Sequence, residues 1–188
     1  MVLTPNFFNV HVDRSDGVGH AHLQLDDPTR WYEIVDILDS VGPVTAWEPL
    51  TFTLSEGVGV CDYMLNSLSR LCSRRMFDVV EANRAASDDL QWLECRLVDA
   101  SGIAREYGLI HFSSHPDVLD RGSTIWAAHD MLVKPVVDLD KAVGQHIFSF
   151  PHSRVHLVVS SSMRGALQDA GCTGVEFSAI AVTPSTTP

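Results

Sequence analysis

Histidine is the residue type in this sequence with the clearest potential for chemistry. Nine histidines occur, and six of them form closely spaced pairs: His20 with His22, His111 with His115, and His152 with His156. Imidazole nitrogens bind zinc and other transition metals, and residues two apart on a strand share one face. The chain has no H-E-x-x-H motif, however, and none of the pairs has an evident third ligand. A metal-dependent hydrolase that uses His20, His22, His111 or His115 is therefore the alternative hypothesis.

Other motifs give no stronger indication of catalysis. Acids lie close together at Asp26 and Asp27, Asp88 and Asp89, and Asp138 and Asp140. General acid–base catalysis needs two carboxyl groups that converge in a cleft, which neighbouring acids in turns rarely do. The chain also lacks a phosphate-binding glycine loop and a G-x-S-x-G nucleophile motif. We therefore predict no enzyme activity, no cofactor and no metal.

The four cysteines are scattered at positions 61, 72, 95 and 172, with no C-x-x-C spacing. Widely spaced cysteines do not form a zinc site, so we expect small buried thiols in a reducing compartment. The first thirteen residues lack the basic and apolar regions of a signal peptide, and no apolar run is long enough to span a membrane. We therefore expect a cytoplasmic protein.

In the first half of the chain, helical and strand patterns are mixed. Residues 7–12 and 51–54 have strand character. Asp27 is a predicted N-cap followed by Pro28 at the first helical position, and apolar residues then repeat at helical spacing as far as Val41. Apolar residues of 61–71 repeat at helical spacing as well. Ser73 is the predicted N-cap of a further helix.

The second half of the chain is richer in strands. Residues 90–98 and 103–112 flank a turn at 99–102, and residues 147–150 and 155–159 flank a second turn, so each set predicts a hairpin. Ser160 or Ser161 is expected to cap a helix that ends near Gly171, and 175–182 reads as a final strand. Strands and helices do not alternate regularly. The prediction is an α+β fold with a mainly antiparallel sheet and a few short helices.

The charge of the chain is strongly negative and unevenly distributed. The formal net charge is −11, and the stretch from Asp13 to Asp62 holds ten acids and two bases. Such a field repels nucleic acid and anionic membranes, and it attracts basic proteins. Acidity also keeps proteins soluble, so charge alone does not identify a partner. Nucleic-acid and membrane binding are excluded from the expected functions.

Several motifs from about Trp47 onward resemble those of a known family. They are Ser73-Arg74-Arg75, Leu90 to Cys95, Gly102 with Tyr107, Lys134 to Asp138, Gln145 to Phe148, Leu157 to Ser160, Ala166-Leu167, and Gly171 to Phe177. In this order they resemble a family of bacterial immunity proteins from polymorphic toxin systems, formerly a domain of unknown function. The resemblance covers about two-thirds of the chain and does not extend to residues 1–45. Most of the matching residues are apolar or turn residues, which specify a fold rather than a site.

The resemblance implies an α+β protein without a catalytic motif that neutralises a toxin used between competing cells. Many such toxins are nucleases, which are often basic, so the expected partner is a cognate toxin with a basic nuclease domain. We expect an acidic N-terminal region at 1–46 packed on the core, an immunity-protein-like domain at 47–183 and a flexible tail at 184–188. The oligomeric state is open.

The resemblance transfers no toxin-contacting residues, so the predicted site rests on charge and on its position outside the matching motifs. The predicted partner-binding residues are Asp13, Asp16, Asp26, Asp27, Glu33, Asp36 and Asp39. Three tryptophans, Trp31, Trp47 and Trp126, would anchor an interface if exposed, although core packing is the expected role.

Overall fold

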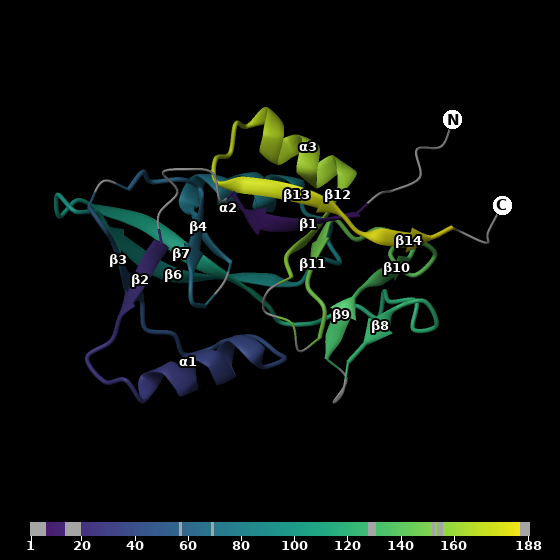
Figure 1. Ribbon diagram of the computed structural model, residues 1–188, viewed down its shortest axis with the longest axis horizontal. Coiled ribbons are helices and arrows are strands. Elements are labelled where there is room, and N and C mark those ends of the chain that lie inside the picture. The colour runs from purple at the N-terminus through teal and green to yellow at the C-terminus, as the bar shows by residue number, and fades with distance from the viewer. Residues whose placement is uncertain are drawn as a thin grey trace.

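A computed structural model describes residues 7–13, 20–56, 58–68, 70–127, 131–151, 153 and 156–184. The helices are α1 (Arg30–Asp39), α2 (Arg74–Asn83) and α3 (Ser161–Asp169). The strands are β1 (Phe7–Val12), β2 (His20–Gln24), β3 (Leu50–Leu54), β4 (Tyr63–Asn66), β5 (Leu71–Ser73), β6 (Leu90–Val98), β7 (Ala104–Phe112), β8 (Ile125–Trp126), β9 (Leu132–Lys134), β10 (Val136–Asp138), β11 (Ile147–Phe148), β12 (Val158–Ser160), β13 (Val175–Ala179) and β14 (Ala181–Thr183). Most strand pairs are antiparallel, which confirms the predicted α+β fold (Figure 1).

The centre of the fold is a closed barrel with the strand order β2-β3-β6-β7-β5-β4. Its longest pairing is the β6–β7 hairpin, which confirms the predicted turn at 99–102. Asp99 fixes that turn, because its carboxylate accepts hydrogen bonds from the backbone amides of Ser101 and Ile103, both at 3.0 Å. Apolar side chains such as Phe52, Leu97 and Leu109 are fully buried in a core shared with α1.

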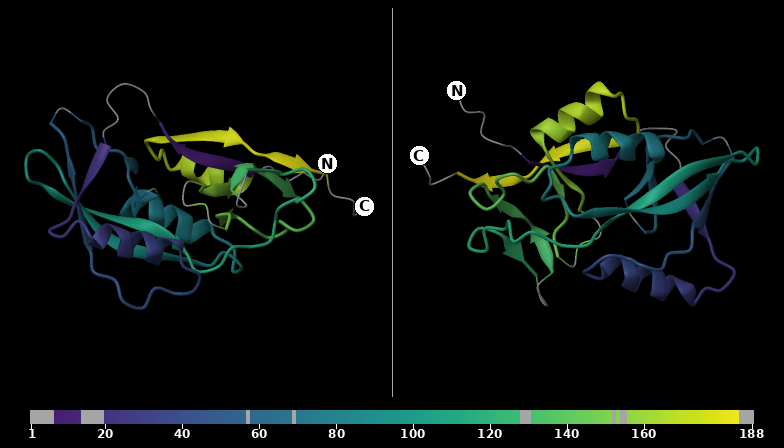
Figure 2. Two further views of the ribbon diagram at one scale, coloured as in Figure 1. Left: turned by 60° about the horizontal axis from the view of Figure 1, so that its bottom comes forward. Right: turned by 180° about the vertical axis from the view of Figure 1, so that it is seen from behind.

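A second sheet, with the order β11-β12-β1-β13, joins the two ends of the chain. Strand β1 lies between β12 and β13, so residues from the start of the chain pair with residues near its end. Helices α2 and α3 lie side by side over this sheet (Figure 2). Both begin at a predicted cap: Ser73 Oγ accepts from Met76 N, and Ser160 Oγ accepts from Met163 N.

The helical spacing at 61–71 does not produce a helix. The segment instead forms β4 and β5, which pair antiparallel as barrel strands. Two local features oppose a helix. Asn66 Oδ1 accepts a hydrogen bond from Leu68 N at 2.7 Å, and Arg70 has a φ of 54°, in the left-handed region. Both strands bury their apolar residues in the barrel, so tertiary contacts decide the structure of this segment against its helical spacing.

Other boundaries differ from the prediction in smaller ways. The first helix begins at Arg30 rather than Pro28, and Asp27 caps the preceding turn instead, since its carboxylate accepts from Thr29 N at 2.8 Å. The predicted last strand is divided into β13 and β14, which join different sheets. The second hairpin is confirmed where β11 pairs with β12, while part of its turn, including His152, lies outside the described residues.

All four cysteines are free, with Cys72 and Cys95 buried and the other two half-buried. Among the described residues, no helix combines the length and apolar character needed to cross a membrane.

Candidate functional site

Five of the predicted acids lie together around the start and outer side of α1. Asp26 and Asp27 occupy the turn between β2 and α1, and Glu33, Asp36 and Asp39 lie on α1. All five are exposed, and we call them the acidic face. No Lys or Arg occurs in the sequence between Arg30 and Arg70. Arg30 itself forms an ion pair with Glu48 at 2.8 Å, so this region keeps a negative potential.

Of the three acids on α1, only Glu33 lies in the first turn, where the helix dipole favours an anion. Glu33, Asp36 and Asp39 are spaced by three residues, which places like charges near one another on a helix surface. Within the described part of the chain, no Lys or Arg forms an ion pair with Glu33 or Asp36. Asp39 lies in the last turn, where the helix dipole disfavours an anion. The charges of Asp36 and Asp39 therefore gain nothing from the helix dipole, and both side chains are exposed to a partner.

The other two predicted acids are not part of this face. Asp13 is half-buried at the end of β1, where its backbone N–H donates to Gly174 O at 3.0 Å. Strands β1 and β13 lie on the opposite side of the molecule from α1 (Figures 1 and 2). Asp16 lies outside the described residues. Their roles in binding stay predictions.

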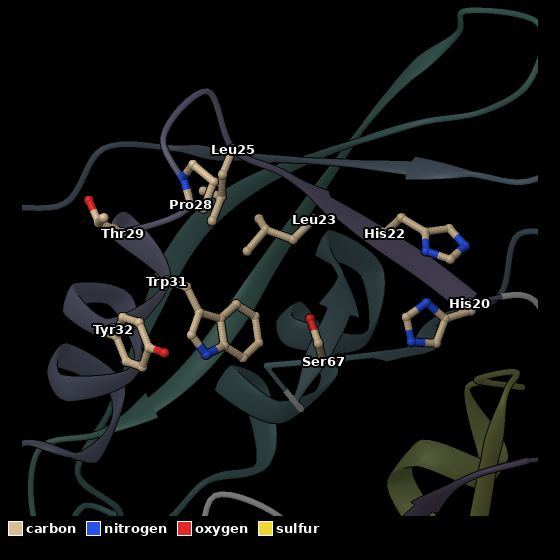
Figure 3. Close-up of a pocket in the computed structure, with 9 residues that line it drawn as sticks. All are labelled: His20, His22, Leu23, Leu25, Pro28, Thr29, Trp31, Tyr32 and Ser67. Carbon is tan, nitrogen blue, oxygen red and sulfur yellow. The ribbon is translucent and has the colours of Figure 1, made fainter.

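A groove opens next to the acidic face, between β2 and the first turns of α1 (Figure 3). Its volume is about 730 Å³. The apolar part of its lining consists of Leu23, Leu25, Pro28, Trp31 and Tyr32, and the polar part consists of His20, His22, Thr29 and Ser67. We call this the α1 groove. Sequence reasoning did not predict it, because barrel closure brings Ser67 next to β2 and α1 from a distant part of the chain.

The tryptophans differ in their surroundings. Trp31 is half-buried, and its indole extends from α1 into the middle of the α1 groove (Figure 3). Trp47 is half-buried against the barrel core and donates its indole N–H to Glu94 O at 2.8 Å. Trp126 is exposed on β8. Trp31 lies in the α1 groove, whereas Trp47 lines a separate hollow with Glu33, so Trp31 is the tryptophan that fits an anchoring role in the groove.

His20 and His22 share a face of β2, as their spacing predicts, with ring centroids 4.6 Å apart. Burial lowers the pKa of His20, and the charge of His22 lowers it further. The surroundings of His20 therefore favour its uncharged form. The two imidazoles form one end of the α1 groove (Figure 3).

The other two candidate metal-binding histidines, His111 and His115, have partners of their own. His111 is buried, with its Nε2 3.0 Å from Gly42 O, and His115 Nδ1 lies 3.2 Å from Ser149 O. Across the described ranges, no group of three or more His, Cys, Asp or Glu side chains could hold a metal ion. The structure thus gives the hydrolase hypothesis no converging set of ligands.

A buried aspartate, Asp62, explains two of the motifs that the sequence presents. Its carboxylate accepts from Ser73 Oγ at 2.6 Å, from Arg75 Nη2 at 2.7 Å and from Thr173 N at 2.8 Å. Burial by itself raises the pKa of Asp62, but the hydrogen bonds from Arg75, Ser73 and Thr173 outweigh it and lower the pKa to about 2. We call this group the Asp62 junction.

The Asp62 junction connects Ser73-Arg74-Arg75, at the start of α2, with Gly171 to Phe177, which leads into β13. Arg75 Nη2 also donates to Gly171 O at 2.6 Å. Gly174 has a φ of 76°, and a Cβ there would collide with Cys61 Sγ. These motif residues hold the barrel, α2 and the second sheet together, so their role is structural. No local spacing links Asp62 to Thr173, which is why sequence reasoning missed the contact.

An α+β domain with an exposed acidic face beside a partly apolar groove has a surface suited to binding a protein partner. Comparison with known families identifies it further. The model of the immunity protein family Imm11 matches residues 25–182, so the chain belongs to the Imm11 family. None of the curated proteins matches the chain.

The family match confirms the resemblance and extends it. It begins at residue 25 and therefore includes α1 and the acidic face, which the motifs did not reach. The five acids of the acidic face therefore lie within the region that the family model matches. Their assignment as a binding site rests on exposure and charge.

Proposed function

We propose that this immunity protein protects the cell that produces the toxin, and its kin, by binding a cognate toxin through the acidic face. The observation that carries the proposal is the negative surface of α1. Its acids are exposed, and no base lies between Arg30 and Arg70 in the sequence. Complementary charge accelerates association and excludes partners of the wrong sign.

The toxin that best fits this surface is a nuclease of a polymorphic toxin system. A nuclease needs a basic cleft, because it must bind the phosphates of its substrate. An acidic protein surface competes for that cleft by the same charge interaction. We propose that binding takes place in the cytoplasm, where a toxin of this kind meets nucleic acid.

Co-expression with the cognate toxin domain tests the proposal. Wild-type protein should rescue growth, and the double variant Asp36→Lys, Asp39→Lys should rescue it poorly. The matched control is Asp169→Lys, Glu176→Lys, which makes the same charge change at exposed positions on α3 and β13, away from α1 (Figure 1). If the α1 variant folds normally and rescues as well as the control does, the acidic face is not the interface.

A further inference from the structure

We propose that the α1 groove is the anchor pocket of this interface, and that it takes one bulky apolar side chain of the toxin flanked by Lys or Arg. This inference rests on the proposed function and adds the chemistry of the contact. The groove would bind the apolar side chain, and the acidic face beside it would pair with the flanking cations.

The lining of the groove suits an apolar anchor. Leu23 and Leu25 of β2 and its following turn lie opposite Trp31 and Tyr32 of α1 (Figure 3). Tyr32 is 72% exposed, so burial of its ring remains available to a partner. Interface hot spots are rich in Trp and Tyr side chains that pack around an inserted group. The groove volume, about 730 Å³, lies within the range of pockets that bury a ligand of small-molecule size.

The charges around the groove indicate which residues should flank the inserted apolar side chain. Asp26 and Asp27 immediately precede Pro28 and Thr29 of the lining, and Glu33 follows Tyr32. The lining contains no Lys or Arg. A segment that carries only apolar residues would leave these acids without partners, whereas Lys or Arg on either side of the anchor would pair with them. Charge complementarity therefore favours a basic protein segment over a neutral small molecule.

The position of the acids also fits the usual division of an interface. Apolar side chains form the centre of a protein–protein contact, and charged side chains form its rim. Here Asp27 directly precedes Pro28 of the lining, and Asp36 lies one helical turn beyond Tyr32, so exposed carboxylates adjoin the lining residues. The groove should therefore control the dissociation rate, and the acids should control the association rate.

Isothermal titration of the purified toxin domain tests the pocket with two variants. Tyr32→Ala removes one wall while keeping a good helix former, and Ser67→Trp fills the groove from an exposed position. We expect each to weaken binding by about 30-fold, as for an interface hot spot. Controls are Val143→Ala, which removes a side chain that is 74% exposed outside the groove lining, and Ser101→Trp at the exposed β6–β7 turn. Both should change affinity less than twofold.

The outcomes separate the pocket from the proposed function. If wild-type protein does not bind the toxin, the proposed function fails. If wild type binds and Asp36→Lys, Asp39→Lys weakens binding while both groove variants bind normally, the function stands and the pocket is wrong. If the groove variants bind the toxin normally but lose binding of an apolar fluorescent dye, the groove serves a small molecule, which overturns the proposal. If the groove variants weaken binding and the charge variant does not, the proposed basic flank is wrong.

Discussion

The replacement Asp62→Asn should destabilise the protein by removing the charge on which the Asp62 junction depends. An asparagine keeps one acceptor oxygen and presents an amide NH2 to groups that themselves donate. Arg75 and Thr173 would then face a donor instead of a carboxylate oxygen. Because Asp62 is 8% exposed, water cannot readily replace the lost hydrogen bonds.

The size of the effect follows from the pKa of Asp62. Its value falls from 3.8 in the unfolded chain to about 2 in the folded protein. One pKa unit corresponds to about 1.4 kcal/mol, so ionised Asp62 contributes on the order of 2 kcal/mol to the free energy of unfolding. A folded pKa below the unfolded one means that this contribution is complete above pH 3.8 and is lost as the pH falls toward 2. At neutral pH, Asp62→Asn should lower the melting temperature by roughly 4–8 °C.

Thermal and urea unfolding of the wild type and of Asp62→Asn between pH 7 and pH 2 would measure this loss of stability. Other carboxyl groups also titrate, so the informative quantity is the difference between wild type and variant, which should shrink below pH 4. Asp78→Asn is a suitable control, because Asp78 is largely exposed in its pair with Arg74 and should contribute less than about 0.5 kcal/mol. A difference for Asp62→Asn that stays constant down to pH 2 would refute the electrostatic origin of the stabilisation.

Three further predictions concern the backbone, the thiols and the charge of the interface. Gly174→Ala should lower the free energy of unfolding in urea by more than about 1 kcal/mol, because Gly174 has a φ of 76° and an added Cβ would collide with Cys61. Gly102→Ala, with open space around the added Cβ, should lower it by less. Alkylation of Cys72 and Cys95 by iodoacetamide at pH 7.5 should be slow in the folded protein. Burial raises the pKa of Cys95 to about 12 and places the pKa of Cys72 well above its usual value, so both thiols stay protonated. Rapid modification of either cysteine would contradict their burial. The association rate of the wild-type protein with the toxin should fall by roughly tenfold or more between low and high salt, and that of the Asp36→Lys, Asp39→Lys variant should fall less. Equal salt dependence of the two rates would argue against electrostatic steering by α1.

The parts of the fold that the sequence predicts are those held by local contacts. Ser73 and Ser160 cap helices through bonds to residues three positions away, and Asp99 forms its turn within five residues. The β6–β7 hairpin follows from that turn and from the apolar runs on either side. Each of these features is decided within a short stretch of chain, so pattern and propensity suffice.

The parts that could not be predicted depend on distant contacts. The apolar spacing at 61–71 fits a helix as well as it fits two buried strands, and only barrel closure decides between them. The same closure brings Ser67 to the α1 groove, and packing of the second sheet against the barrel brings Thr173 to Asp62. For the candidate site, the acidity of residues 26–39 was readable from the sequence. The groove beside them was not, because its walls come from separate segments.

The most direct test of toxin neutralisation by the acidic face is a titration of the purified toxin domain with this protein, with nuclease activity as the readout. We predict that one equivalent of wild-type protein forms a stable complex and abolishes the activity. The Asp36→Lys, Asp39→Lys variant should require at least about tenfold more protein, and the Asp169→Lys, Glu176→Lys control should behave as wild type. Full nuclease activity in the presence of excess wild-type protein would contradict the proposed function.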